Sequence, residues 1–218
     1  MFPIIVLFPT FAIMETKEQF LLAITELFMK YGIKSLTMDD ISRHLGISKK
    51  TLYQFATDKK DLVKQCVELT VNSEECMLCN IATQKGNAID EMFDVNKRIS
   101  QKLQNVQPAV MYDLQKYYPD AWKVMESHKQ CFVYDMIVEN IKRGIEEGLY
   151  RDNVNEEITA KIYVGLIDRM FDSEFFPTNK YSFEVLHREI ARYHIRGIAS
   201  EKGAKYLAQK LTNENLNF

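Results

Sequence analysis

The chain has 218 residues, enough for one large domain or for a small domain followed by a larger one. It contains 46% apolar and 27% charged residues, as an ordinary globular protein does, and its 8 Gly and 5 Pro are too few for a turn-rich all-β fold. The net charge of −2 argues against a protein that coats nucleic acid over its whole surface, but it is compatible with a local basic patch.

Cysteine content and the start of the chain bear on its location. The four cysteines are too few and too unevenly spaced for a disulfide framework, which favours a reducing cytoplasm. No stretch approaches the roughly 18–20 apolar residues that a membrane helix needs, so we expect no membrane partner. Residues 1–13 are apolar and interrupted by Pro3 and Pro9, without the basic start or the cleavage site of a signal peptide. We therefore expect translation to begin at Met14 and residues 1–13 to be a non-native or disordered leader.

Three short helices are predicted within the first 55 residues. The first has one apolar stripe and ends at Gly32. The stripe consists of Phe20, Ile24, Leu27, Phe28 and Tyr31. Thr37 is suited to cap the second helix, with Asp40 three positions later. Gly46 supplies the positive φ of a tight turn, and Ser48 caps the third helix. The expected inward positions of these two helices are Ile41, Leu45, Leu52 and Phe55.

This arrangement is typical of a helix-turn-helix, here at about residues 37–55. Charge is concentrated in the same place: from Arg43 to Lys60 five basic residues and one acidic residue give a net +4, which leaves −6 for the rest of the chain. A positive surface on an acidic protein suits the neutralisation of phosphates by one end of the molecule. The candidate DNA-binding side chains of the third helix are its cap Ser48 and the polar residues Lys49, Lys50, Thr51, Tyr53 and Gln54.

The rest of the chain predicts longer helices and no strand, because valine and isoleucine nowhere alternate with polar residues over more than a few positions. The helices are expected at about 59–80, 87–104, 108–117, 120–147, 155–173, 182–198 and 201–211. Pro108 and Pro119 suit first turns of helices, whereas Gly148 and Pro177 suit helix ends. We therefore predict an all-α protein.

Several N-terminal stretches agree together in residue type and spacing with one family. They are Leu27-Phe28-x-x-Tyr31-Gly32, then Leu36-Thr37-x-x-x-Ile41-Ser42-x-x-Leu45-Gly46-Ile47-Ser48-Lys49-Lys50-Thr51-Leu52-Tyr53-Gln54, then Asp58-Lys59-Lys60-x-Leu62. Over about residues 15–65 the chain resembles the TetR/AcrR family of regulators. A looser likeness, at Gly144-Ile145-x-x-Gly148-Leu149-Tyr150-Arg151, is to the end of a long ligand-domain helix. The resemblance implies a homodimer of subunits with a three-helix DNA-binding domain at 14–62, a helical effector-binding and dimerisation domain at 63–211, and a tail at 212–218.

Carried over position by position, the resemblance implies a phosphate contact for Thr37 and another for Lys59 at the start of the fourth helix. Tyr53 would touch the backbone or a thymine methyl group. The residues facing base edges would be Lys49, Lys50 and Thr51. The family usually has an aromatic residue where this chain has Ala56, and His or Tyr where it has Phe55. We expect Phe55 to take the core position, which puts the backbone contact there in question.

Two recognition helices related by a two-fold axis would reach major grooves roughly 34–36 Å apart, which predicts a palindromic operator. In the family the last two long helices form the dimer interface, and here these would be 155–173 and 182–198. Their apolar stripes are Ile158, Ile162, Leu166 and Met170 in the first, and Leu186, Ile190, Tyr193 and Ile198 in the second.

The effector pocket is less well defined by the sequence. Aromatic and methionine side chains are dense between about residues 92 and 176, which suits an adaptable apolar cavity, although core packing is the commoner explanation for any one of them. The candidate ligand-binding residues are Phe93, Tyr112, Trp122, Phe132, Met136 and Tyr163. An effector bound there would favour a dimer whose heads no longer match the operator. The sequence names no effector.

Two alternatives stay open. A constitutive DNA-binding regulator, whose helical body only dimerises, has the same sequence features. A helical-bundle metalloenzyme needs paired Glu-x-x-His motifs, and only Glu184-x-x-His187 is present. Cys76-x-x-Cys79 has no second pair to complete a zinc site. The sequence therefore favours a regulator that is not an enzyme and uses no metal or other cofactor.

Overall fold

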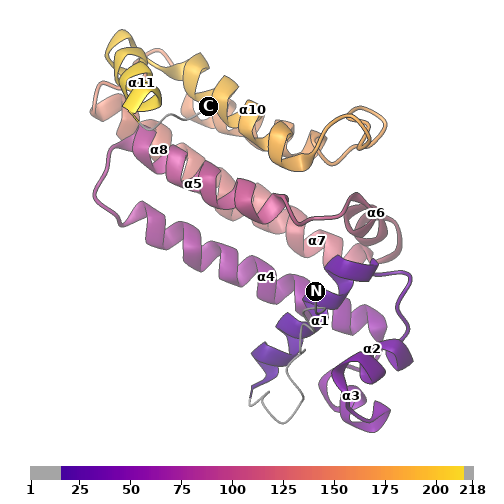
Figure 1. Cartoon of the computed structure of the whole chain (residues 1–218). Coiled ribbons are helices and arrows are strands. Elements are labelled where there is room, and N and C mark those ends of the chain that lie inside the picture. The colour runs from indigo at the N-terminus through magenta and orange to yellow at the C-terminus, as the bar shows by residue number, and fades with distance from the viewer. Residues whose placement is uncertain (1–15, 214–218) are drawn as a thin grey trace, which may run out of the picture. The chain divides into compact units, whose positions relative to one another are not determined.

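The computed structural model describes residues 16–213, and this part of the chain is built from helices (Figure 1). They are α1 (Lys17–Tyr31), α2 (Met38–Leu45), α3 (Lys49–Phe55), α4 (Lys59–Ala82), α5 (Ala88–Leu103), α6 (Pro108–Tyr117), α7 (Pro119–His128), the π-helical η2 (Lys129–Val133), α8 (Tyr134–Glu146), α9 (Glu156–Arg169), α10 (Phe183–Ile198) and α11 (Glu201–Asn213). The predicted all-α class is confirmed, and only an isolated bridge joins Tyr150 and Ala199. The expected leader, residues 1–13, and the tail beyond residue 213 lie outside the described residues.

The chain divides into two compact units. The first holds the described residues up to Ser73 and Gln107–Met125, and the second holds Glu74–Val106 and the residues from Glu126 onward. The first unit is therefore larger than the predicted segment 14–62, because it includes α6 and most of α7. Within residues 16–213, no helix combines the length and apolarity needed to cross a membrane.

Helix α6 belongs to the first unit because it is hydrogen-bonded to the turn between α1 and α2. The backbone N–H of Lys34 donates to Asp113 Oδ2 at 2.8 Å, and Lys34 Nζ donates to the Tyr117 hydroxyl at 3.0 Å. Gln107 Nε2 reaches the carbonyl of Lys30 at 3.3 Å. These partners are about 80 residues away along the chain, so no local pattern in the sequence indicated them.

The predicted caps of the first three helices are confirmed. Thr37 and Asp40 form a capping box at the start of α2, and the Ser48 side chain accepts from the backbone N–H of Thr51 at the start of α3. Gly32 ends α1 with φ 82°, and Gly46 ends α2 in the left-handed region with φ 67°. That backbone conformation is costly for residues with a Cβ atom, so Gly46 fixes the turn that separates α2 from α3.

The predicted helix at 120–147 is present as α7, η2 and α8 in succession, with a π turn that sequence patterning did not indicate. The turn begins directly after His128, and both His128 and Lys129 are buried. Each of these two side chains has carboxylate partners from another helix: Glu74 and Glu75 for His128, and Asp168 for Lys129. Single π turns of this kind often occur at functional sites in helices.

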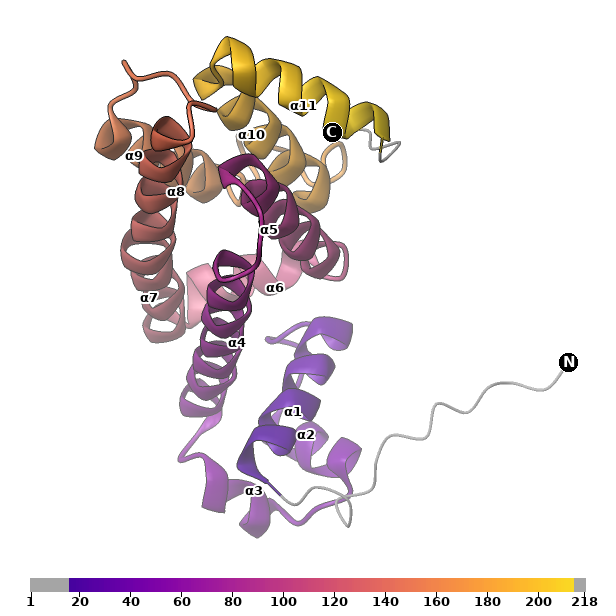
Figure 2. The ribbon, with the colours of Figure 1, turned by 90° about the vertical axis from the view of Figure 1, so that its left-hand side faces the viewer.

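The core of the second unit is formed by α5, α8, α9, α10 and α11, and Figure 2 shows α9 beside α8 and α10 beside α5. Tyr150 is 2% exposed and its hydroxyl donates to Asn140 Oδ1 at 3.1 Å. A Cβ atom at Gly144 would lie 2.0 Å from the Tyr150 ring, and one at Gly203 would lie 2.0 Å from the Leu149 carbonyl oxygen. These two glycines therefore permit the close packing of the turn after α8 against α8 and α11.

Candidate nucleic-acid interface

Helix α3 has one buried side and one polar, solvent-facing side. Leu52 is completely buried, and Ile41 and Leu45 of α2 are buried as predicted. The outward side chains are Lys49, Lys50, Tyr53 and Gln54, which are exposed, and Thr51, which is half-buried. Because Leu52 anchors the helix, these polar groups are presented together to solvent. An element of this size and polarity is suited to the major groove of DNA.

The two lysines at the start of α3 differ in their contacts. Lys49 Nζ lies 2.5 Å from Asp39 Oδ1 of α2, and both side chains are at least half exposed. Lys50 has no ion pair or hydrogen bond within residues 16–213. Exposed ion pairs contribute little to stability, so the Lys49 pair can exchange for a phosphate or a base at small cost. Lys50 is already available to an external acceptor.

Thr37 is exposed at the first turn of α2, where backbone N–H groups point away from the helix. Its hydroxyl accepts from the N–H of Asp40 at 3.1 Å and donates to Asp40 Oδ2 at 2.6 Å. These hydrogen bonds lower the pKa of the Asp40 carboxyl, which stays ionised. The observed role of Thr37 is to cap α2. A phosphate bound at this position would also lie beside the free N–H groups at the N-terminus of α2.

The structure explains the departure from the family pattern at Phe55 and Ala56. The Phe55 ring stacks on Phe20 of α1 with centroids 4.3 Å apart, and Ala56 is 4% exposed. Gln65 Nε2 of α4 donates to the Phe55 carbonyl at 3.0 Å. Phe55 thus packs against α1, as expected, and its side chain has no polar atom with which to contact DNA.

Lys59 differs from the expectation of a phosphate contact. Its ammonium group donates to the carbonyls of Ile33, at 2.6 Å, and of Leu36, and it lies 6.0 Å from the centre of the Tyr118 ring. Burial lowers the pKa of this lysine. The carbonyls belong to the turn between α1 and α2, so Lys59 joins the start of α4 to that turn instead of extending toward DNA.

We expect Lys59→Met to destabilise the first unit by about 1–3 kcal/mol, because two backbone carbonyls lose their donor. Lys60→Met is the matched control, since Lys60 is the exposed neighbour on the same helix. Urea denaturation followed by circular dichroism measures both. Equal stability of Lys59→Met and Lys60→Met, together with a selective loss of DNA affinity in Lys59→Met, would restore the phosphate assignment.

The second unit contains a cluster of charged side chains around the buried His128 that sequence patterning missed. His128 Nδ1 lies 3.0 Å from Glu75 Oε1, and Nε2 lies 3.3 Å from Glu74 Oε1. A carboxylate beside each ring nitrogen requires both nitrogens to donate, so the imidazole is protonated. Burial alone would lower the pKa of His128, but the two glutamates outweigh it and the pKa is raised above 6.5. Lys102 of α5 also pairs with Glu74, at 3.6 Å.

This cluster predicts a pH-dependent stability. Because the pKa of His128 is raised in the folded protein, its contribution is complete below the unfolded value of 6.5 and is lost as the pH rises through the folded pKa. The free energy of unfolding of wild type minus that of His128→Phe should therefore decrease from pH 6 toward alkaline pH, to be measured by urea denaturation at a series of values from about pH 6 upward. His44→Phe is a suitable control, since His44 is exposed. A difference that is constant with pH would contradict the protonated cluster.

The six candidate ligand-binding residues do not form one site. Tyr112 is 49% exposed on α6, and Trp122 is half-buried on α7, both in the first unit. The other four lie in the second unit. They are Phe93 and Tyr163, which are buried in its main core, and Phe132 and Met136, which are half-buried beside the cluster of Leu78, Ile81 and Val95. The aromatic density seen in the sequence is thus largely core packing.

The residues considered for metal binding are not gathered into one set of ligands in the described part of the chain. Glu184 pairs with Arg188 at 3.6 Å, whereas His187 Nδ1 faces Asn96 Nδ2 at 3.1 Å. Cys76 and Cys79 are free and exposed. In the described part of the chain, no group of three or more His, Cys, Asp or Glu side chains is arranged to hold a metal ion.

The two helices expected to dimerise expose only part of their apolar stripes. Ile158 and Ile162 of α9 are 59% and 55% exposed, and Tyr193 of α10 is 71% exposed. The other stripe members are covered to a greater extent: Met170, Leu186 and Ile198 are buried, and Leu166 and Ile190 are half-buried. Met170, Leu186 and Ile198 therefore pack inside the subunit, and Ile158, Ile162 and Tyr193 are the stripe residues that remain exposed.

Residues 20–66, which include α2 and α3, match the tetR family of bacterial regulatory proteins. Over 173 residues the chain is 23% identical to YvaF of Bacillus subtilis, an uncharacterized HTH-type transcriptional regulator, covering 78% of this chain and 89% of that protein. The fold is similar to that of a transcriptional regulator from Cytophaga hutchinsonii, with a TM-score of 0.68, 23% identity, and 84% and 98% of the two chains covered. The fold is also similar to that of FadR of Bacillus subtilis, whose crystal structure is a complex with stearoyl-CoA. The TM-score is 0.65 at 14% identity, and the match covers 84% of this chain and 100% of FadR.

Proposed function

We propose that this chain, a transcriptional regulator of the TetR/AcrR family, is a homodimeric repressor that a small-molecule effector releases from a palindromic operator. The observation that carries the DNA-binding part is the outward side of α3, where Lys49, Lys50 and Tyr53 are exposed on a helix anchored by the fully buried Leu52. Operator binding requires access to the chromosome, so the proposed role places the protein in the bacterial cytoplasm.

Each proposed DNA contact has a distinct task. Lys50 and Thr51 face base edges, together with Lys49 once it leaves Asp39, and they choose the sequence. Thr37 and the capping Ser48 hold the helix starts against phosphates, and these contacts raise affinity without choosing sequence. Tyr53 and Gln54 lie farther along the exposed side of α3, within reach of the backbone or of a thymine methyl group.

Dimerisation through α9 and α10 is supported by the apolar side chains that these helices leave exposed. Ile158, Ile162 and Tyr193 would each lose unfavourable contact with water on burial between subunits. A two-fold axis between such faces relates the two α3 helices, so the operator would be a palindrome with half-sites roughly 34–36 Å apart.

The effector is proposed to act in the second unit by a population shift. FadR, which shares the fold at 14% identity, was crystallised with stearoyl-CoA, which supports a ligand-binding role for the same helical body. Among the sequence candidates, Phe132 and Met136 are best placed, because they are half-buried beside a small apolar cluster. Helix α4 contributes residues to both units and is a covalent path between them. An effector that shifts the equilibrium must differ in affinity between the two dimer states by a few kcal/mol.

Lys50→Ala should weaken binding to the operator by about tenfold or more, because a base-edge or phosphate contact is lost without any change in folding. Its affinity for DNA of unrelated sequence should fall less. Lys205→Ala is the control, since Lys205 is exposed on α11 in the second unit. Fluorescence anisotropy with the operator, selected from genomic fragments, measures the wild type and the Lys50→Ala, Lys49→Ala and Lys205→Ala variants. Wild-type operator affinity in both Lys50→Ala and Lys49→Ala would refute the proposed interface.

A constitutive regulator is the alternative, and an effector screen separates the two. We expect a compound that raises the melting temperature of the protein and weakens operator binding in the same concentration range, since an effector must favour one dimer state. Thermal shift and anisotropy with a panel of acyl, aromatic and cationic compounds measure both effects. Ligands that stabilise the protein but leave operator affinity unchanged would support the constitutive alternative.

A further inference from the structure

Two free thiols lie three positions apart near the C-terminal end of α4. Cys76 and Cys79 are both exposed, on a helix that ends at Ala82. Residues at this spacing are neighbours on one side of an α-helix. Leu78 and Ile81 of the same stretch are buried and belong to a small apolar cluster. The two thiols therefore occupy the solvent side of α4, outside the core.

The backbone spacing of the pair suits a disulfide, whereas the directions of the side chains oppose one. Cα atoms three residues apart in an α-helix are about 5 Å apart, within the roughly 4.4–6.8 Å that disulfides span. Their Cβ atoms are about 5–6 Å apart, although a disulfide needs roughly 3.5–4.5 Å. A bond between Cys76 and Cys79 thus requires the turn that joins them to change shape. Helix ends open more readily than helix centres, and residues 83–86 after α4 are exposed.

The other two cysteines have no cysteine within one helical turn of them. Cys66 is buried on α4, and burial raises the pKa of its thiol to about 12, so it stays protonated and shielded from solutes. Cys131 is exposed, but it lies on η2. The chain therefore holds one candidate pair and two cysteines that serve as internal comparisons.

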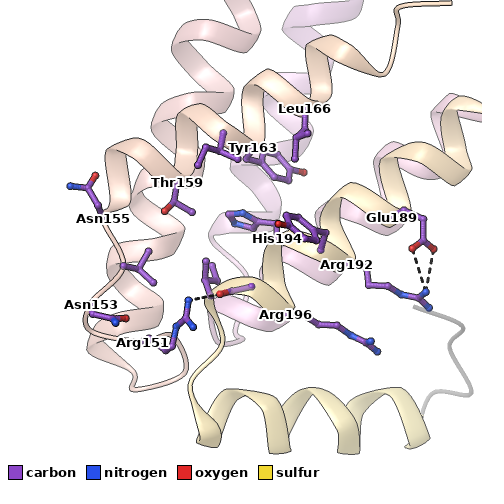
Figure 3. Close-up of a pocket in the computed structure, with 15 residues that line it drawn as sticks. Arg151, Asn153, Asn155, Thr159, Tyr163, Leu166, Glu189, Arg192, His194 and Arg196 are labelled. Atoms are coloured by element: carbon purple, nitrogen blue, oxygen red, sulfur yellow. Dashed lines mark hydrogen bonds and ion pairs between the residues drawn. The ribbon is translucent and has the colours of Figure 1, made fainter. Parts of the chain in front are cut away.

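The face proposed for dimerisation does not include these thiols. It is formed by α9 and α10, where Ile158, Ile162 and Tyr193 are exposed. Figure 3 shows the groove of about 810 Å³ between these two helices, and α4 contributes no residue to its lining. A dimer formed through that face therefore leaves Cys76 and Cys79 open to a small solute.

We propose that Cys76 and Cys79 are a redox-sensitive site, at which hydrogen peroxide forms an intrahelical disulfide that lowers the affinity of the regulator for its operator. The first thiolate attacks a peroxide oxygen, so that an S–O bond forms and the O–O bond breaks. The departing hydroxide takes up the proton that the thiol lost, and a sulfenic acid remains. The second thiolate attacks the sulfenic sulfur, and the hydroxyl group leaves as water with the second proton. Each disulfide consumes one peroxide and releases two waters.

The position of the pair connects this bond to DNA binding. Helix α4 contributes residues to both units. The pair directly follows Glu74 and Glu75, whose carboxylates bind His128 of α7. A reshaped turn at 76–79 thus alters the helix that links the two units. In a reducing cytoplasm the thiols stay free until an oxidant reaches them, and an exposed, strained disulfide is readily reduced afterwards. The regulatory effect rests on the proposed operator binding, whereas formation of the bond does not.

Counting thiols under denaturing conditions, after treatment of the full chain with one equivalent of hydrogen peroxide, tests the bond. Wild type should lose two of its four thiols without forming a cross-linked dimer on a non-reducing gel, and dithiothreitol should restore them. Cys131→Ser is the matched control, because it removes the other exposed cysteine and should still lose two thiols. Cys76→Ser and Cys79→Ser should instead yield a sulfenic acid that dimedone traps. Retention of all four thiols in wild type, or of all three in Cys131→Ser, would overturn the site.

Fluorescence anisotropy with the operator, before and after oxidation, tests the regulatory effect. Oxidation should raise the dissociation constant of wild type and of Cys131→Ser by about fivefold or more, and dithiothreitol should reverse the change. The double variant Cys76→Ser, Cys79→Ser should bind equally well before and after treatment. Circular dichroism verifies that the oxidised protein is folded.

The outcomes separate this inference from the proposed function. Oxidised wild type that contains the disulfide but keeps its operator affinity would refute the regulatory effect. Reduced wild type that does not bind an operator would refute the proposed function, and the thiol count would still decide whether Cys76 and Cys79 form the bond.

Discussion

The seven-residue helix α3 is too short to persist alone in water, and its position depends on the complete burial of Leu52. Two further contacts act on the same helix: Phe55 stacks on Phe20, and Gln65 of α4 donates to the Phe55 carbonyl. Because the inward side is fixed in this way, Lys49, Lys50 and Tyr53 are held outward as a rigid set. A reading surface that is already ordered loses little conformational entropy when it binds DNA.

Lys59 and His128 are titratable side chains that the fold covers, and each has hydrogen-bond partners from another part of the chain. Lys59 at the start of α4 donates to the carbonyls that end the turn after α1. Farther along the same helix, Glu74 and Glu75 bind the protonated His128. Removing one member of such a pair leaves an uncompensated buried group, which costs more than the pair itself contributes. Helix α4 is therefore fixed by polar contacts within each unit, whereas apolar side chains such as Leu62 and Leu78 fill the space beside it.

Buried polar side chains of the second unit differ in whether their hydrogen bonds are made. Tyr150, Asn140 and the carbonyl of Ala88 form a complete chain of hydrogen bonds inside the core. His194, by contrast, is buried and has an unpartnered nitrogen beside the exposed Tyr193. The network of Tyr150 stabilises the subunit, whereas the His194 nitrogen carries the cost of a buried polar atom without a partner.

Local chemistry alone determined most of the helices, the caps of the first three and the polar, outward side of α3. Thr37, Gly46 and Ser48 were readable because capping and positive φ depend on neighbours within three or four residues. The tertiary structure decided everything that depends on distant partners. It assigned α6 to the first unit through Asp113, turned Lys59 inward, buried His128 between two glutamates, and divided the apolar stripe of α10 into a buried Leu186 and an exposed Tyr193. A helical period shows which residues share a face, but only packing shows whether that face meets the core or solvent.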